Sequence, residues 1–186
     1  MAPTGKTKKR VSDRETKKNG GEKKVKEEAI RFIETFHLLP RLVVFDLDYT
    51  LWPFYCECRA KGEPCLYPEA KGILCALKEK GIDMAIASRS AAPDFANAFL
   101  EKLGIKALFV TKEIGHSSTH KRDHFQRIHS STGIPFNSML FFDDDTKNTQ
   151  AVSDMGVTSI LVSNGLDLDA LSRGLTDFSA KIVYTV

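Results

Sequence analysis

The stretch Val43-Val44-Phe45-Asp46-Leu47-Asp48-Tyr49-Thr50-Leu51-Trp52 carries the strongest structural signal in this chain. It opens with a run of β-branched and aromatic residues, which predicts a strand over Leu42–Phe45 that is covered on both faces. Asp46 and Asp48 follow at once, so we expect both at the carboxyl edge of a sheet, where open α/β folds bind ligands. Two such acids repel each other unless a cation or a shared proton lies between them. They either cap a turn or perform chemistry in which one carboxylate attacks phosphorus beside a divalent metal.

Size and composition indicate one soluble globular domain. The chain has 186 residues, of which 42% are hydrophobic and 27% charged, enough for a single sizeable core. No apolar run approaches the roughly 18 residues that span a bilayer, and residues 1–21 lack the apolar segment of a secretory signal. We therefore expect a cytoplasmic protein with no membrane partner, with the nucleus as a second location.

The basic character belongs to the N-terminus. Residues 1–40 hold eleven Lys or Arg and six Asp or Glu, whereas the rest of the chain is slightly acidic. We expect residues 1–24 to form a disordered, solvated tail and residues 25–186 to form the domain. The basic runs Lys8-Lys9-Arg10 and Lys17-Lys18 could contact nucleic acid or serve as a nuclear address, but we expect no nucleic acid partner for the folded part.

Four cysteines lie within twenty positions: Cys56, Cys58, Cys65 and Cys75. Their spacing is not that of a paired C-x-x-C zinc site, and no histidine lies nearby. Reduced thiols are the default expectation for a chain without a secretory signal. Structural zinc and reversible redox pairing both stay open.

Helical and strand patterns alternate along the chain. An amphipathic lead-in helix spans Val25 to Phe36, and further helices are predicted to end at Gly81, Gly104, Gly133, Gly156 and Phe178. Strands are predicted over residues 42–45, 82–87, 107–110, 139–142 and 158–162. This order predicts the α/β class: a Rossmann-like, doubly wound, mostly parallel sheet of about five strands with helices on both faces.

Polar side chains gather at the ends of three of these strands. In a parallel sheet the strand ends share one edge, so groups distant in sequence converge there. Lys121, at the start of a helix, supplies a positive charge to offset the acids. The converging groups are Asp46, Asp48, Thr50, Ser88, Arg89, Asp143, Asp144 and Asp145.

These residues resemble the four motifs of the haloacid dehalogenase superfamily. The match runs in order through Asp46-x-Asp48-x-Thr50, Ser88, Lys121 and Asp143-Asp144, over about Leu42 to Gly165. The amino-acid sequence of residues 45–53, together with Ala87-Ser88-Arg89 and Phe141–Asp144, is similar to the motifs of the eukaryotic magnesium-dependent phosphatase branch. The resemblance implies a phosphomonoesterase of this fold.

The resemblance also implies roles in the chemistry. Asp46 is the expected nucleophile, which forms an aspartyl-phosphate, and Asp48 is the acid and then the base. Thr50, Ser88 and Lys121 are expected to contact the phosphate, and the Thr50 hydroxyl also to orient the loop. Arg89 is a further candidate contact to a substrate anion.

The implied cofactor is Mg²⁺, which prefers oxygen ligands in an octahedral arrangement. The expected ligands are the carboxylates of Asp46 and Asp143 and the main-chain carbonyl of Asp48. Asp144 and Asn148 are expected to support this set, and Asp145 to cap the following helix.

The gaps between motifs indicate an open, capless site. Thr50 to Pro68 spans only about eighteen positions, and Ser88 to Lys121 is already filled by a helix and a strand, so neither gap holds a folded cap of ~50 residues. Such a site admits a phosphorylated protein side chain of the phosphotyrosine type or a phosphorylated sugar adduct on an amine (a fructosamine-phosphate).

Nearby aromatic and histidine residues leave further alternatives. Trp52, Phe54 and Tyr55 either stack on a substrate ring or pack under the loop, whereas His116, His120 and His124 are interpreted as surface residues. The alternative to an enzyme is a non-catalytic phospho-ligand binding or scaffold protein on the same fold. The sequence leaves the oligomeric state open.

Overall fold

A five-stranded parallel sheet organises the chain, with strand order β3-β2-β1-β4-β5. The computed structural model describes residues 5–59, 63–115 and 120–183. The parallel pairing and the alternation with helices confirm the predicted α/β class. The strands are β1 Leu42–Phe45, β2 Asp83–Ser88, β3 Thr111–Ile114, β4 Met139–Asp143 and β5 Thr158–Leu161.

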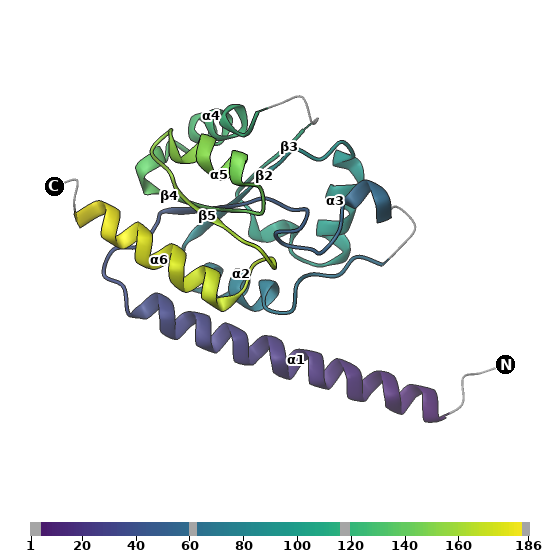
Figure 1. Ribbon diagram of the computed structural model, residues 1–186. Helices are drawn as coiled ribbons and strands as arrows, with labels where there is room; N and C mark the ends of the chain where they lie inside the picture. Colours follow the sequence, from purple (N-terminus) through teal and green to yellow (C-terminus); the bar gives the residue numbers. More distant parts are fainter. Residues whose placement is uncertain (1–4, 60–62, 116–119, 184–186) are drawn as a thin grey trace.

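Helices cover both faces of the sheet (Figure 1). The long α1, with α2, α3 and α6, packs on one face, and α4 and α5 pack on the other. The helices are α1 Gly5–Glu34, α2 Ala70–Glu79, α3 Pro93–Lys102, α4 Lys121–Thr132, α5 Thr146–Ser153 and α6 Leu168–Val183. Three short 3-10 helices complete the described elements: η1 Cys56–Arg59, η2 Lys106–Leu108 and η3 Phe136–Ser138.

The central strand β1 shows why the apolar run forms a buried strand. All four of its residues are buried, and successive side chains point to opposite faces. Val43 and Phe45 enter the core below α1, α2 and α6, whereas Leu42 and Val44 enter the core below α4 and α5. Phe45 stacks on Phe142 of β4 with ring centroids 5.6 Å apart.

The prediction of a strand over residues 107–110 is wrong. Lys106–Leu108 form the 3-10 helix η2, and β3 lies at Thr111–Ile114. Phe109 is buried against Phe45, so the apolar residues there serve the core. The actual strand lies at the sheet edge and is only half-buried throughout, which allows it a polar sequence.

The helix α1 begins at Gly5, about twenty residues before the predicted lead-in helix. Its C-terminal half packs on α2 where Gly72 permits close contact, because a Cβ on Gly72 would lie 2.7 Å from a methyl group of Val25. Lys26 pairs with Glu79 of α2 at 2.5 Å. The division of the chain into a disordered tail and a domain at residue 24 stays a prediction.

The two segments in which a cap could lie contain only small elements. Between Thr50 and Ala70 the described residues form η1, and between Ser88 and Lys121 they form α3, η2 and β3. Across the described ranges, none of the helices combines the length and apolar character needed to cross a bilayer.

Candidate active site

The carboxyl edge of the sheet holds a cavity of about 260 Å³. The register places Phe45, the last residue of β1, opposite both Ile86 of β2 and Phe142 of β4. Strand β4 ends one residue later at Asp143 and β2 two residues later at Ser88. The residues that follow them therefore meet. The cavity is lined by Asp46, Asp48, Tyr55, Glu57, Ser88, Arg89, Ser90, Ala91, Lys121, Asp144, Asp145 and Asn148.

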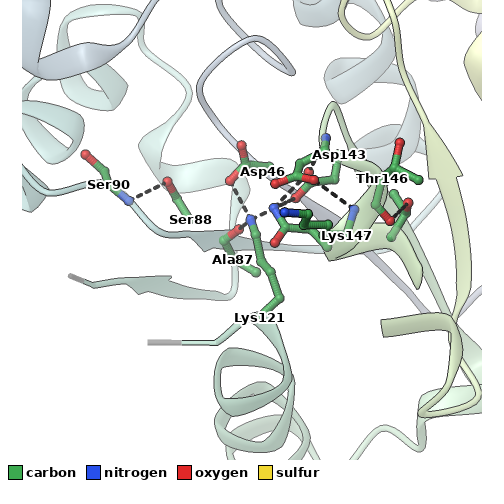
Figure 2. A network of polar contacts seen from close by, with 11 residues as sticks. Asp46, Ala87, Ser88, Ser90, Lys121, Asp143, Thr146 and Lys147 are labelled. Carbon is green, nitrogen blue, oxygen red and sulfur yellow. Dashed lines mark hydrogen bonds and ion pairs between the residues drawn. The ribbon is translucent and has the colours of Figure 1, made fainter. Parts of the chain in front are cut away.

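Lys121 is the buried cation of the site. Its side chain extends from the first turn of α4 between Asp46 and Asp143 (Figure 2). The ammonium Nζ lies 2.5 Å from Asp46 Oδ1 and 2.9 Å from Asp143 Oδ2, and it also donates to the carbonyl of Ala87. Burial alone would lower the pKa of Lys121, but the two carboxylates raise it above its ordinary value, so Lys121 stays charged.

Three carboxylates form a group that can hold a metal ion. Oxygens of Asp46, Asp143 and Asp144 all lie within 4.8 Å of one another. Burial raises the pKa of Asp46 against the effect of Lys121, and the charge of Asp143 raises it further. Burial, with the charge of Asp143, also raises the pKa of Asp144 to about 6. The single ammonium of Lys121 leaves negative charge in excess, and an all-oxygen donor set fits a hard divalent cation such as Mg²⁺.

Asp143 is held in place by the start of α5. The side-chain amide of Asn148 donates to both carboxylate oxygens of Asp143, at 3.1 and 3.2 Å, and the Asp145 amide donates at 2.8 Å. The Asp145 side chain accepts from the Lys147 amide at 2.8 Å and caps the helix. Asn148 thus orients Asp143, as its expected supporting role requires. Asp144, which was expected only to support the metal ligands, is itself one of the three grouped carboxylates.

Asp48 receives two hydrogen bonds on one oxygen. The indole Nε1 of Trp52 donates to Oδ1 at 2.6 Å and the Cys56 amide donates at 3.2 Å. Burial raises the pKa of Asp48, and the bond from Trp52 opposes that rise. Its main-chain carbonyl as a metal ligand stays a prediction.

Ser88 and Arg89 line the cavity, whereas Thr50 does not. Ser88 is 2% exposed, and its hydroxyl accepts the Ser90 amide at 3.3 Å. Thr50 is fully buried, and its carbonyl accepts the Leu166 amide at 2.8 Å. Thr50 therefore anchors the loop, and its expected contact with the phosphate is not found at the cavity wall.

The aromatic residues divide into two pairs. Trp52 and Phe54 are buried and stack on each other with centroids 5.8 Å apart, so they pack under the loop. Tyr55 is 53% exposed, lines the cavity and contacts the ring of Tyr49 edge to face. Tyr49 has a φ of +55°, a rare conformation for a bulky residue. Of Trp52, Phe54 and Tyr55, therefore, Tyr55 is the residue that can contact a substrate.

The interpretation of His124 as a surface residue is wrong. His124 is fully buried because it lies on the inner face of α4 beside Phe125. His120 is exposed and exchanges capping hydrogen bonds with Asp123 at the start of α4. His116 lies outside the described residues.

Neutral His124 predicts a loss of stability in acid. Burial, followed by the charge of Lys121, lowers the pKa of His124 from 6.5 to about 4. Between these two pH values His124 is protonated in the unfolded chain but neutral in the folded protein. The free energy of unfolding therefore falls as the pH drops from about 6.5 toward 4. Between pH 7 and pH 5 we expect the wild type to lose roughly 2 kcal/mol more than His124→Gln, as measured by urea denaturation. Equal losses in the two proteins would contradict this.

The four cysteines are free thiols that do not converge. Cys56 is buried, Cys58 and Cys65 are exposed, and Cys75 is half-buried. Over residues 5–59, 63–115 and 120–183, the only group of potential metal ligands that includes a cysteine is Asp48, Cys56 and Glu57, and it contains just one. The structure thus offers no support for a zinc site there.

Comparison with known proteins agrees with this arrangement. The family model described as acid phosphatase matches residues 38–65 and 59–181. The chain belongs to the acid phosphatase family. The human protein named magnesium-dependent phosphatase 1 is 41% identical over 157 residues, 76% of this chain and 88% of that protein. A HAD-like hydrolase superfamily protein of Schizosaccharomyces pombe is 33% identical over 144 residues, 64% of this chain and 83% of its own.

Solved structures share the fold. A phosphatase domain of Bacteroides fragilis, crystallised with Mg, has a TM-score of 0.58 and 19% identity, and the match covers 80% of this chain and 40% of that one. The two relatives confirm the resemblance to the eukaryotic magnesium-dependent phosphatase branch of the haloacid dehalogenase superfamily, and the solved structure agrees with the fold.

Sequence reasoning missed the residues that hold Asp48. Trp52 lies four positions after Asp48, and Cys56 lies eight positions after it. From the sequence, Trp52 was interpreted as a packing or stacking residue and Cys56 as part of a group of thiols. Glu57 and Ala91 also line the cavity without having been expected there. A loop that turns back on its own acid leaves no periodic pattern to detect.

Proposed function

We propose that this protein is a magnesium-dependent phosphomonoesterase that works through an aspartyl-phosphate on Asp46. One observation carries the proposal: Asp46 lies at the cavity wall with Lys121 Nζ 2.5 Å from one oxygen and Asp143 and Asp144 close by. The acid that the reaction requires, Asp48, lines the same cavity. This set can bind a phosphate dianion only when further positive charge is present, which agrees with the magnesium dependence in the name of the human relative.

The residues divide the reaction between them. An oxygen of Asp46 attacks phosphorus, and the bond from phosphorus to the leaving oxygen breaks as Asp48 donates its proton to that oxygen. A water then attacks the aspartyl-phosphate, gives its proton to Asp48 and releases Asp46 and phosphate. Lys121 holds the attacking carboxylate in place, and Ser88 donates its hydroxyl to a phosphate oxygen. Bound Mg²⁺, held by Asp46, Asp143 and Asp144, would supply the charge that lets an anion approach a carboxylate.

The substrate class follows from access to the cavity. The described residues after Thr50 and after Ser88 form short elements and no separate lid domain, and exposed Tyr55 stands at the wall. We propose a large or extended phosphomonoester, either a phosphotyrosine-type protein side chain or a fructosamine-phosphate type adduct. A panel of phosphopeptides and phosphorylated sugar amines assayed with the purified protein distinguishes the two.

Metal removal tests the activity directly. We expect phosphate release from p-nitrophenyl phosphate to be abolished by EDTA and restored by excess Mg²⁺, because Lys121 alone does not neutralise the grouped carboxylates. Phosphate release is measured colorimetrically before and after chelation. Phosphopeptide binding with no turnover at any Mg²⁺ concentration would instead favour a scaffold protein, and turnover unaffected by EDTA would reject the metal.

A further inference from the structure

The carboxylate of Asp48 is asymmetrically occupied. Both donors that reach it, the indole Nε1 of Trp52 at 2.6 Å and the Cys56 amide at 3.2 Å, bind the same oxygen, Oδ1. Asp48 also lines the active-site cavity. With Oδ1 committed to the protein, Oδ2 is the oxygen left for proton transfer.

Trp52 is fixed by the core. Its side chain is fully buried, stacks on Phe54 and meets the Phe99 ring of α3 edge to face, with centroids 6.0 Å apart. Its amide donates to the carbonyl of Leu47 at 3.2 Å. An indole that packs against two mutually contacting rings and is fixed at its backbone keeps its N–H in one direction.

The residue that carries the second donor is fixed by a contact with the loop after β2. Cys56 is fully buried, and its Sγ lies 2.8 Å from the hydroxyl of Ser90. The Ser90 amide in turn donates to Ser88 Oγ at 3.3 Å. The orientation of Asp48 is thereby tied to the loop that carries the expected phosphate ligand Ser88.

We propose that Trp52 is the positioning residue of Asp48: together with the Cys56 amide it holds Oδ1, so that Oδ2 carries the transferred proton. This inference rests on the proposed function. In the first step the proton leaves Oδ2 for the leaving-group oxygen as the bond from that oxygen to phosphorus breaks and the bond from Asp46 to phosphorus forms. In the second step the attacking water returns a proton to Oδ2, and the bond from Asp46 to phosphorus breaks.

Trp52→Phe separates positioning from packing because phenylalanine fills most of the same space and lacks the N–H. An alkyl phosphate such as glycerol phosphate needs the acid to expel its poor leaving group, whereas p-nitrophenolate leaves unaided. We expect kcat/KM for the alkyl phosphate to fall about 10- to 100-fold, the scale for a misdirected catalytic group. For p-nitrophenyl phosphate we expect kcat and KM to fall together with little change in kcat/KM, because only the later attack by water needs Asp48.

Phe109→Leu is the matched control. It removes a buried ring that packs against Phe45 and leaves both donors to Asp48, and the rings that pack against Trp52, in place. We expect it to affect the two substrates alike. An equal loss of kcat/KM on both substrates in Trp52→Phe would overturn the positioning role while leaving the phosphatase proposal intact. A wild type that hydrolyses neither substrate would overturn both.

A spectroscopic measurement tests the contact in the native fold, even should Trp52→Phe fail to fold. Trp52 is the single tryptophan of the chain, so the one indole N–H resonance in a ¹H–¹⁵N spectrum belongs to it. We expect a strongly downfield, slowly exchanging signal that moves upfield in Asp48→Asn, where the acceptor loses its charge. An indole signal identical in both proteins would overturn the proposal independently of any assay.

Discussion

Replacing Asp46 by Asn is expected to reduce phosphate release by roughly 10⁴-fold or more, the scale for removing a catalytic nucleophile. The amide has almost the shape of the carboxylate but does not attack phosphorus at a useful rate. The ion pair between Lys121 and Asp143, 2.9 Å apart, does not involve Asp46, so we expect the rest of the site to be retained. Initial rates on p-nitrophenyl phosphate measure the loss, and acid quenching of the wild type with labelled substrate traps the aspartyl-phosphate.

The same substitution is expected to leave the melting temperature unchanged or to raise it. Burial raises the pKa of Asp46 above its ordinary value, which means that its charged form is disfavoured in the metal-free fold at neutral pH. A neutral amide removes that penalty, so activity and stability change in opposite directions. Asp154→Asn, the same chemical change at the exposed end of α5, serves as the control and should retain full activity. Robust turnover by Asp46→Asn would reject the covalent mechanism.

The position of the site was predictable because parallel strands bring their ends together. Asp46, Ser88 and Asp143 each follow or end an apolar strand that is paired in register, and this follows from local patterns plus one topological rule. The strand β1 was equally clear, since a run buried on both faces leaves a continuous apolar signature.

Other features depend on tertiary contacts that no local pattern encodes. The edge strand β3 is half polar and has no apolar run. The strand was instead predicted around the buried Phe109, which lies just before it. The burial of His124 depends on where α4 docks, and the bond from Trp52 to Asp48 depends on how the loop after β1 folds back. In each case the deciding partner lies in another element or across a turn.

Replacing Lys121 by Met is expected to destabilise the metal-free protein by about 3–5 kcal/mol, because removing one partner of a buried ion pair leaves the other charge uncompensated. Lys121 is 2% exposed and is paired with both Asp46 and Asp143. Without it, the folded protein is expected to retain a carboxyl proton that the unfolded chain releases at neutral pH. The stability deficit of the variant should therefore shrink as the pH falls from 7 toward 5.

Magnesium distinguishes charge compensation from simple packing in this variant. A divalent cation among Asp46, Asp143 and Asp144 replaces the lost positive charge, so saturating Mg²⁺ should raise the melting temperature more in Lys121→Met than in the wild type. Activity should still fall about 10²- to 10³-fold, since the cation at the attacking carboxylate is absent in the transition state. Arg122→Met, a substitution at the exposed next residue of α4, controls for loss of a nearby positive charge and should change neither quantity much. If Mg²⁺ raises the melting temperature of Lys121→Met no more than that of the wild type, the ammonium of Lys121 is not what balances these carboxylates.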